Sequence, residues 1–125
     1  MPYFCRSVIS QAMNHGLQRS LSGSRILILG VAYKADIGDV RETPAEKLIH
    51  LLRNAGAEVA YHDPHVGEFD GMRSTALEPE AYDCVVIVTA HSTVDYGDVV
   101  ARARIVVDFR NATKGHEDAQ KVWKL

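Results

Sequence analysis

Two cationic side chains follow apolar segments that are far apart in the sequence. Lys34, next to Tyr33, comes shortly after the apolar run 25–31, and Arg110 follows the apolar run 104–109. Lysine offers a point charge that suits a phosphate or sugar oxygen, and arginine offers a planar set of donors. If both runs are parallel strands, their carboxyl ends meet at one edge of a sheet. The two cations then converge on one crevice, which favours binding of an anionic ligand.

Each cation also has a structural interpretation. Lys34 can be a solvated loop lysine, and Arg110 can be an ion-pair partner of Asp108 or Asp63. Spacing alone leaves these alternatives open.

Two further polar residues follow predicted strands. Asp63 directly follows the predicted strand 57–62, at the place where a nucleotide-binding sheet often carries a ribose-binding acid. Without a glycine fingerprint, however, Asp63-Pro64 is more typical of a simple turn. His91 follows the apolar run 83–89, and a loop or helix-capping role is favoured over contact with a ligand.

The loop after the first apolar run carries several charges. We interpret Asp36, Asp39, Arg41 and Glu42 as a network that fixes this long loop and the start of the next helix. A bidentate arginine holds carboxylates well.

The residues of a cofactor site and of a catalytic centre are missing. A dinucleotide fingerprint requires GxGxxG at the first turn, and only Gly30 is present in a loop of about a dozen residues. We therefore expect no NAD site in this chain. Neither a Ser/His/Asp nor a Cys/His set is visible, and Cys5 has no identifiable base or oxyanion site. We expect no catalytic residue here.

The elements that position the cations follow from the hydrophobic pattern. Short apolar runs rich in β-branched residues alternate with amphipathic segments. This alternation predicts the α/β class, a Rossmann-like three-layer domain with a mainly parallel sheet, preceded by an N-terminal helix. The predicted elements are helix 3–21, strand 25–31, a helix starting at Thr43-Pro44, strand 57–62, at most a short helix within 77–81, strand 83–89, helix 93–103 and strand 104–109.

The start of the second helix has the strongest local signal. Thr43 offers a capping hydroxyl, Pro44 needs no amide partner, and Glu46 completes a capping box. Gly56 stands where a left-handed C-terminal residue is usual.

Composition restricts the class of ligand. The formal net charge is -2, and the basic residues are scattered, so general binding to nucleic acid or to a membrane is not expected. No apolar stretch is long enough for a membrane span, and no signal peptide is recognisable. The two cysteines, of which Cys84 is a buried strand thiol, form no CxxC pair, and the six histidines show no ligand spacing. We expect a cytoplasmic protein with no metal.

Several segments together closely resemble the C-terminal domain of the UDP-glucose/GDP-mannose 6-dehydrogenase family. They are Leu29-Gly30-Val31-Ala32-Tyr33-Lys34, Asp36, Asp39, Arg41-Glu42-Thr43-Pro44-Ala45, Gly56-Ala57-Glu58-Val59, Tyr61-His62-Asp63-Pro64 and Asp108-Phe109-Arg110-Asn111. The resemblance covers nearly the whole chain, and its motif is closer to enzymes acting on UDP-N-acetylhexosamines or UDP-hexoses than to the GDP-mannose branch.

The resemblance implies roles for three residues. Lys34 matches the lysine that contacts the nucleotide sugar, Tyr33 the aromatic residue beside it, and Arg110 the arginine at the sugar-binding edge. Family members oxidise the C6 hydroxymethyl of a nucleotide sugar to a carboxylate with NAD. An N-terminal domain binds the NAD, and a central helical domain supplies the catalytic cysteine, for which Cys5 is not a counterpart.

The same resemblance implies a division of the chain. Residues 1–21 correspond to the end of the central dimerisation helix, and residues 22–125 to the UDP-sugar-binding domain. We therefore expect an inactive chain without the NAD-binding and central domains. Any homodimer should form through the first helix, whose apolar face exceeds what a small sheet needs, or through a surface that the missing domains normally cover. A stand-alone nucleotide-binding or regulatory module is the alternative.

Overall fold

The apolar runs of the sequence form one sheet in the computed structural model, which describes residues 2–41, 43–118 and 121–124. Its strands are β1 (Arg25–Leu29), β2 (Glu58–His62), β5 (Cys84–Ile87), β6 (Val106–Asp108) and β7 (Val122–Lys124). All neighbouring pairs are parallel, in the order β2-β1-β5-β6-β7. The predicted α/β class with a mainly parallel sheet is confirmed.

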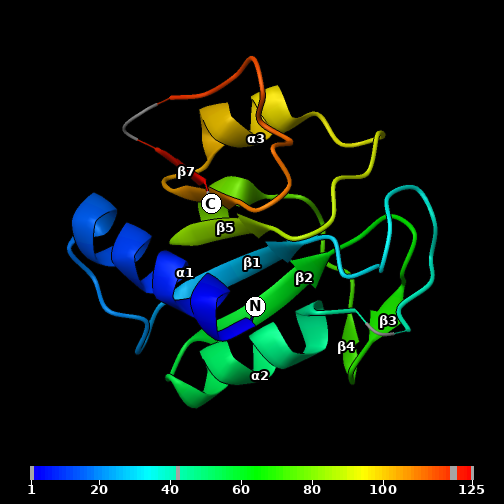
Figure 1. The fold of residues 1–125 in the computed structure, drawn as a ribbon, viewed down its shortest axis with the longest axis horizontal. Helices are drawn as coiled ribbons and strands as arrows, with labels where there is room; N and C mark the ends of the chain where they lie inside the picture. Colours follow the sequence, from blue (N-terminus) through cyan, green and yellow to red (C-terminus); the bar gives the residue numbers. More distant parts are fainter. Residues whose placement is uncertain (1, 42, 119–120, 125) are drawn as a thin grey trace.

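Helices cover both faces of this sheet (Figure 1). Helices α1 (Pro2–Leu17) and α2 (Ala45–Asn54) lie on one face, and α3 (Tyr96–Arg102) lies on the other. Because side chains alternate along a strand, Ile26 and Ile28 pack with α1 and α2, whereas Leu27 and Leu29 pack with α3. The strand patterns are therefore continuous apolar runs.

Helix α1 is shorter than predicted and is covered by its own chain. It ends at Leu17 rather than at residue 21, because Gln18 adopts a φ of 55° and the Arg19 amide donates to the Met13 carbonyl at 3.1 Å. This bond and the left-handed residue before it end the helix. Ile9 and Met13 are fully buried in the core that α2 and the sheet share. Part of the apolar face of α1, which was predicted to exceed what a small sheet needs, is therefore buried within this chain.

The start of α2 confirms part of the predicted cap. The Thr43 hydroxyl accepts a hydrogen bond from the Ala45 amide at 3.3 Å, and Pro44 has helical dihedral angles. The Thr43 amide donates to the Val40 carbonyl at 3.4 Å, so it does not complete the predicted capping box with Glu46. The turn is held instead by the preceding loop.

Two elements were not predicted. A hairpin of β3 (Glu68–Phe69) and β4 (Met72–Arg73) turns at Asp70-Gly71, where both residues have positive φ. Asp-Gly is a known hairpin signal, but two-residue strands give no alternation to read. Strand β7 is almost as short, with three residues. The predicted short helix within 77–81 is confirmed as a single 3-10 turn, Pro79–Ala81.

Candidate functional site

Four parallel strands end at the same edge of the sheet and continue into polar loops. The loops begin at Gly30 after β1, Asp63 after β2, Val88 after β5 and Phe109 after β6. The chain leaves β1 for β2 on one side and returns to β5 on the other, so the strand order reverses between β1 and β5. Ligands of open α/β sheets bind at such a switch point.

Asp63 is the centre of hydrogen bonding at this edge. Its Oδ2 accepts from the amides of Val31 at 2.9 Å and Ala32 at 3.1 Å and from His91 Nε2 at 2.9 Å, and its Oδ1 accepts from the His65 amide at 2.8 Å. Its side chain is fully buried. The interpretation of Asp63-Pro64 as a simple turn was too limited, because Asp63 joins the loops that follow β1, β2 and β5.

The charge state of Asp63 follows from these contacts. Burial raises the pKa of the Asp63 carboxyl, but hydrogen bonds from His91, His65 and Val31 outweigh it, so the pKa is lowered overall. Asp63 is therefore a carboxylate near neutral pH. Both of its oxygens accept bonds from within the chain, which does not fit a ribose-binding role.

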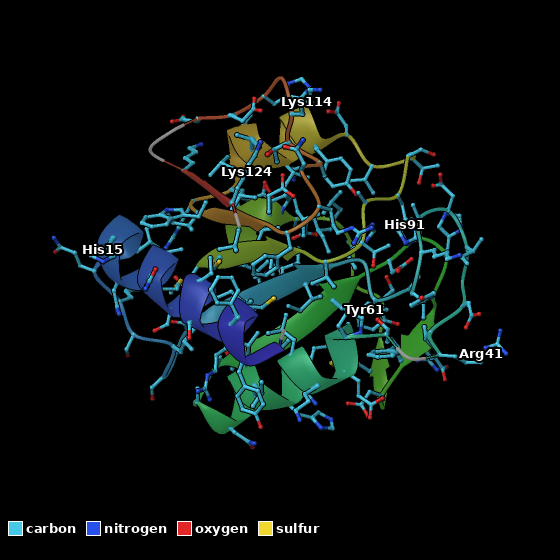
Figure 2. All side chains as sticks on the ribbon, viewed as in Figure 1. His15, Arg41, Tyr61, His91, Lys114 and Lys124 are labelled. Atoms are coloured by element: carbon cyan, nitrogen blue, oxygen red, sulfur yellow. The ribbon has the colours of Figure 1, made fainter. Side chains whose placement is uncertain are left out.

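His91 links Asp63 to the loop after β1. Its side chain is only 1% exposed, and its Nδ1 lies 2.7 Å from the Asp36 amide. Because that amide is a donor, Nδ1 is the acceptor and Nε2 carries the proton donated to Asp63. His91 is thus the neutral Nε2–H tautomer. The predicted loop role of His91 is confirmed. Figure 2 shows it among the loops at this end of the sheet.

Asp36 completes this connection from the other side. Its Oδ1 accepts from the Ser92 amide at 2.8 Å and the Ser92 hydroxyl at 3.0 Å. These hydrogen bonds lower the pKa of the Asp36 carboxyl, and the one from the Ser92 amide has the largest effect. Asp36 has a φ of 63°, a left-handed conformation that aspartate tolerates better than most residues.

The charged network predicted for this loop is present only in part. The Arg41 guanidinium holds Asp39 with both Nε and Nη2, the shortest contact being 2.7 Å, and lowers the pKa of Asp39 to about 2. Arg41 otherwise projects into solvent (Figure 2). Asp36 binds Ser92 rather than Arg41, so it is not part of that pair, and Glu42 lies outside the described residues.

Tyr33 and Lys34 lie exposed on the turn that this network supports. The Lys34 ammonium stands 5.8 Å from the Tyr33 ring centroid, and Tyr33 is 49% exposed. The Tyr33 amide donates to the Asp39 carbonyl at 2.6 Å, which closes the turn. In the part of the chain that the structure describes, Lys34 forms no ion pair with a carboxylate.

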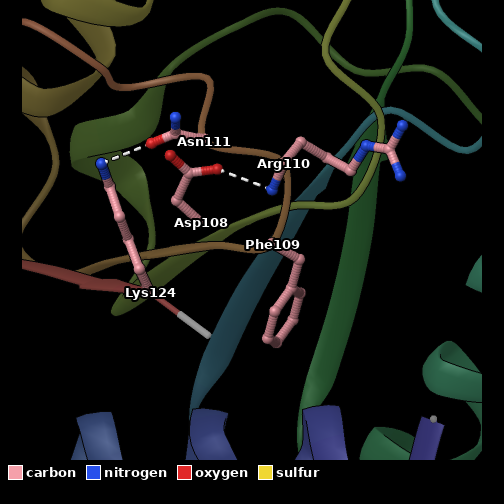
Figure 3. Close-up of a pocket in the computed structure, with 5 residues that line it drawn as sticks. All are labelled: Asp108, Phe109, Arg110, Asn111 and Lys124. Atoms are coloured by element: carbon pink, nitrogen blue, oxygen red, sulfur yellow. Dashed lines mark hydrogen bonds between the residues drawn. The ribbon is translucent and has the colours of Figure 1, made fainter.

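Arg110 borders a hollow at the end of β6 (Figure 3). The hollow, of about 390 Å³, is lined by Asp108, Phe109, Arg110, Asn111 and Lys124. Arg110 meets Asp108 only through its backbone amide, which donates at 2.9 Å, and its guanidinium points away from Lys124. Among the described residues no carboxylate pairs with this guanidinium, so the alternative of an Arg110 ion pair with Asp108 or Asp63 is not observed.

Lys124 is a cation of this hollow that sequence reasoning missed. It lies on β7 and its ammonium contacts Asn111 Oδ1 at 2.7 Å and Glu117 Oε1 at 3.0 Å. Lys34 and Tyr33 do not line the hollow, so the structure places the two predicted cations at the same sheet edge on separate loops.

Potential metal ligands lie close together in two groups, although their spacing in the sequence is not that of a metal site. Asp36, His65 and His91 form one group, and Glu46, His50 and Asp70 form the other. Both ring nitrogens of His91 already have hydrogen-bond partners, so a metal there would have to displace them. In the second group, His50 Nε2 lies 2.8 Å from Asp70.

Neither thiol is activated. Burial raises the pKa of Cys84 to about 12 and also raises that of Cys5. A thiol is nucleophilic as the thiolate, which a lowered pKa favours. Within the described residues no helix has the length and apolar character needed to cross a membrane.

A parallel sheet of this order, with polar loops and exposed cations at its carboxyl edge, defines a Rossmann-like domain of the kind that binds nucleotide ligands. Residues 27–115 match the UDP binding domain of the UDP-glucose/GDP-mannose dehydrogenase family. The chain belongs to this family.

Individual relatives agree with this assignment. The chain is 32% identical over 118 residues to a UDP-N-acetyl-D-mannosamine dehydrogenase of Methanococcus maripaludis, covering 87% of this chain and 27% of that protein. It is 33% identical over 112 residues to UDP-glucose 6-dehydrogenase 4 of Oryza sativa subsp. japonica, covering 90% of this chain and 22% of that protein. The chain therefore spans about a quarter of the length of these relatives.

Solved structures of relatives share the fold. The UDP-D-ManNAc dehydrogenase of Pyrococcus horikoshii superposes with a TM-score of 0.81 at 29% identity, over 98% of this chain and 30% of that one. An NDP-N-acetyl-D-galactosaminuronic acid dehydrogenase of Methanosarcina mazei gives 0.78 at 26% identity, over 99% and 28%. Both matches include the region of α1 as well as the sheet.

Proposed function

We propose that this chain binds the UDP part of a nucleotide sugar for an NAD-dependent UDP-sugar 6-dehydrogenase. In such an enzyme the C6 hydroxymethyl of the sugar is oxidised to a carboxylate. One observation supports the proposal beyond family membership. Lys34 and Arg110 lie on loops at the carboxyl edge of the sheet, and neither has a carboxylate partner among the described residues. Unpaired cations on a fixed scaffold suit a diphosphate.

Three residues have assigned roles in this proposal. Lys34 and Arg110 supply the cationic contacts, and Tyr33 shapes the pocket beside Lys34. Residues 22–125 form the binding domain, and residues 1–21 correspond to the end of a central dimerisation helix, although α1 shares its core with the sheet. The two cations lie on separate loops, so a ligand has to span the distance between them.

The chemistry is assigned to other parts of a longer enzyme. NAD and a catalytic cysteine are proposed to be held outside these residues, because the turn after β1 lacks the fingerprint and both thiols have raised pKa values. We expect the chain alone to reduce no NAD with UDP-glucose or UDP-N-acetylhexosamines. Reduction that Lys34→Ala abolishes contradicts this expectation.

The binding proposal is tested by NMR titration of the chain with UDP, UDP-glucose and AMP. A hydrogen bond to a charged group contributes roughly 1.5 to 3 kcal/mol, so Lys34→Ala and Arg110→Ala should each weaken UDP-glucose binding by about tenfold or more. UDP ligands should shift the resonances of the Tyr33–Lys34 turn and of Arg110 more than AMP does.

Each variant has a matched control. Lys47 also stands over a tyrosine ring, that of Tyr3 at 5.0 Å, so Lys47→Ala matches Lys34→Ala. Arg104 comes shortly before β6, and Arg110 comes shortly after it. Arg104→Ala therefore removes an arginine side chain at the opposite end of the strand and is the control for Arg110→Ala. The site assignment is wrong if UDP-glucose perturbs neither region, or if both site variants bind as their controls do.

A further inference from the structure

The turn that carries Tyr33 and Lys34 has little apolar support. Residues 33 to 38 are all exposed, and the one large aliphatic side chain among them, Ile37, is 43% exposed. Fixing the backbone of a residue costs about 1 to 2 kcal/mol of conformational entropy. The conformation of this turn must therefore depend on polar contacts.

Three backbone hydrogen bonds hold the turn on the two sides of Lys34. On its N-terminal side, the Val31 and Ala32 amides donate to Asp63 Oδ2. On its C-terminal side, the Asp36 amide donates to His91 Nδ1. Asp63 and His91 are joined to each other at 2.9 Å, and the side chains of both are at most 1% exposed. The exposed turn is thus fixed at both ends to one buried pair.

We propose that His91 and Asp63 are positioning residues for nucleotide-sugar binding, which hold the Tyr33–Lys34 turn in the conformation that presents Lys34 to the ligand. This inference rests on the function proposed above. Neither residue has to touch the ligand, because both act through the backbone of the turn. Asp36 adds a third link, since its carboxylate holds Ser92, the neighbour of His91.

The tautomer of His91 makes this arrangement sensitive to protonation. A protonated imidazole has donors at both nitrogens, so the Asp36 amide loses its acceptor. Four titratable groups face His91. The Asp63 carboxylate contacts Nε2, and the Asp36 carboxylate lies 4.0 Å from Nδ1. The His65 ring lies 4.6 Å from the His91 ring, and the Tyr96 side chain is hydrogen-bonded to the His91 backbone. None of these contacts replaces the acceptor that the Asp36 amide would lose.

The test combines one variant that removes the pair with one that preserves it. His91→Ala removes both ring nitrogens. His91→Gln keeps one donor and one acceptor and cannot change charge. His65→Gln is the control for the neighbouring ring. UDP-glucose is the ligand, because its diphosphate is esterified at both ends and has no proton that titrates near neutrality.

We expect His91→Ala to weaken UDP-glucose binding by about tenfold, as Lys34→Ala does, because it acts through the same ammonium. The double variant Lys34→Ala/His91→Ala should bind no more weakly than either single variant, since residues that act as a unit are not additive. His91→Gln should retain most of the affinity. In the wild type and in His65→Gln, affinity should fall as the pH is lowered, because a protonated His91 ring has no acceptor for the Asp36 amide. In His91→Gln this fall should be absent.

A second readout needs no ligand. The hydrogen bond from the Asp36 amide to His91 Nδ1 should give a nitrogen–nitrogen scalar coupling across the bond in ¹⁵N-labelled protein, and His91→Ala should increase amide exchange at Asp36 while the sheet amides stay protected. This measurement also shows whether His91→Ala remains folded. If His91→Ala does not remain folded, the pH dependence of UDP-glucose binding by His91→Gln tests the positioning role instead.

The outcomes separate this inference from the proposed function. If Lys34→Ala weakens binding but His91→Ala is folded and binds as the wild type does, the positioning role is wrong and the proposed function stands. The positioning role is also wrong if the two substitutions are additive, or if affinity shows the same pH dependence in His91→Gln as in the wild type. If the wild type binds no UDP-glucose, both are overturned.

Discussion

Gly30 lies directly against Thr89 where β1 and β5 end. Gly30 has a φ of 85°, and a Cβ built on it would stand 2.6 Å from the Thr89 Cβ and would also overlap the Thr89 carbonyl oxygen. The Thr89 hydroxyl in turn donates to the Ala32 carbonyl at 2.5 Å. The loops after β1 and β5 can approach this closely only because residue 30 has no side chain.

Replacing Gly30 should therefore be costly in two ways. Gly30→Ala imposes a left-handed conformation on alanine, at about 1 to 2 kcal/mol, and forces the two loops apart, at about 1 to 3 kcal/mol. We expect the free energy of unfolding in urea to fall by roughly 2 to 5 kcal/mol. Gly71→Ala is the control, because Gly71 has a φ of 79° but nothing within 4 Å of its Cβ position. Equal losses in the two variants would show that the contact with Thr89 contributes nothing.

Asp108 should make stability depend on acid pH. Burial raises the pKa of the Asp108 carboxyl, but hydrogen bonds from Thr113, Arg110 and Ala112 outweigh it and lower the pKa. A lowered pKa stabilises the fold above the unfolded-state value of about 3.9, and this contribution is lost as the pH falls through the folded-state pKa. Asp108→Asn leaves donors facing an amide and should cost about 1 to 3 kcal/mol at pH 7.

The difference between the wild type and Asp108→Asn should shrink when unfolding is measured below about pH 4, where the unfolded carboxyl becomes protonated. Glu78→Gln serves as the control for an exposed carboxylate and should show little difference at either pH. A constant difference from pH 7 to pH 3 would contradict the assigned charge state.

The two thiols should differ in accessibility. Cys84 is fully buried, with a pKa of about 12, whereas Cys5 is partly exposed. With iodoacetamide at pH 8, we expect Cys5 to be modified first and Cys84 only after denaturation, as read by mass spectrometry of the tryptic peptides. Because burial also raises the pKa of Cys5, it should react more slowly than a free cysteine peptide. Rapid alkylation of either residue would point to an activated thiol that the structure does not contain.

Any self-association should involve the start of α1 and a second copy of the chain. Tyr3 and Phe4 are 57% and 55% exposed, whereas Val8 and Leu17 pack against the core. Exposed apolar clusters tend to be buried on association. Sedimentation velocity should show less dimer for Phe4→Ser than for the wild type, and no change for Ile37→Ser, which removes an exposed apolar side chain elsewhere. A wild type that stays monomeric at high concentration would exclude this dimer.

Local pattern was enough to predict most of the scaffold. The runs around Ile26–Leu29 and Cys84–Ile87 are apolar at every position, which is typical of a strand covered on both faces, and their alternation with helices predicted the parallel sheet. Thr43-Pro44 likewise located the start of α2 correctly, because capping depends on neighbours in the chain. The hairpin and β7 were missed, because strands of two or three residues carry no periodicity to recognise.

The sequence by itself determined the fold class, the family and the presence of Tyr33, Lys34 and Arg110 at loops after strands. Only the tertiary structure decided how the Lys34 turn is held. Asp36, Asp63 and His91 come from three separate loops, and each taken alone has the properties of an ordinary turn residue. Their roles arise when the sheet brings those loops together and removes water from Asp63 and His91, because a buried polar group must then find its hydrogen-bond partners within the protein. Such partners are set by non-local packing, which no local spacing records.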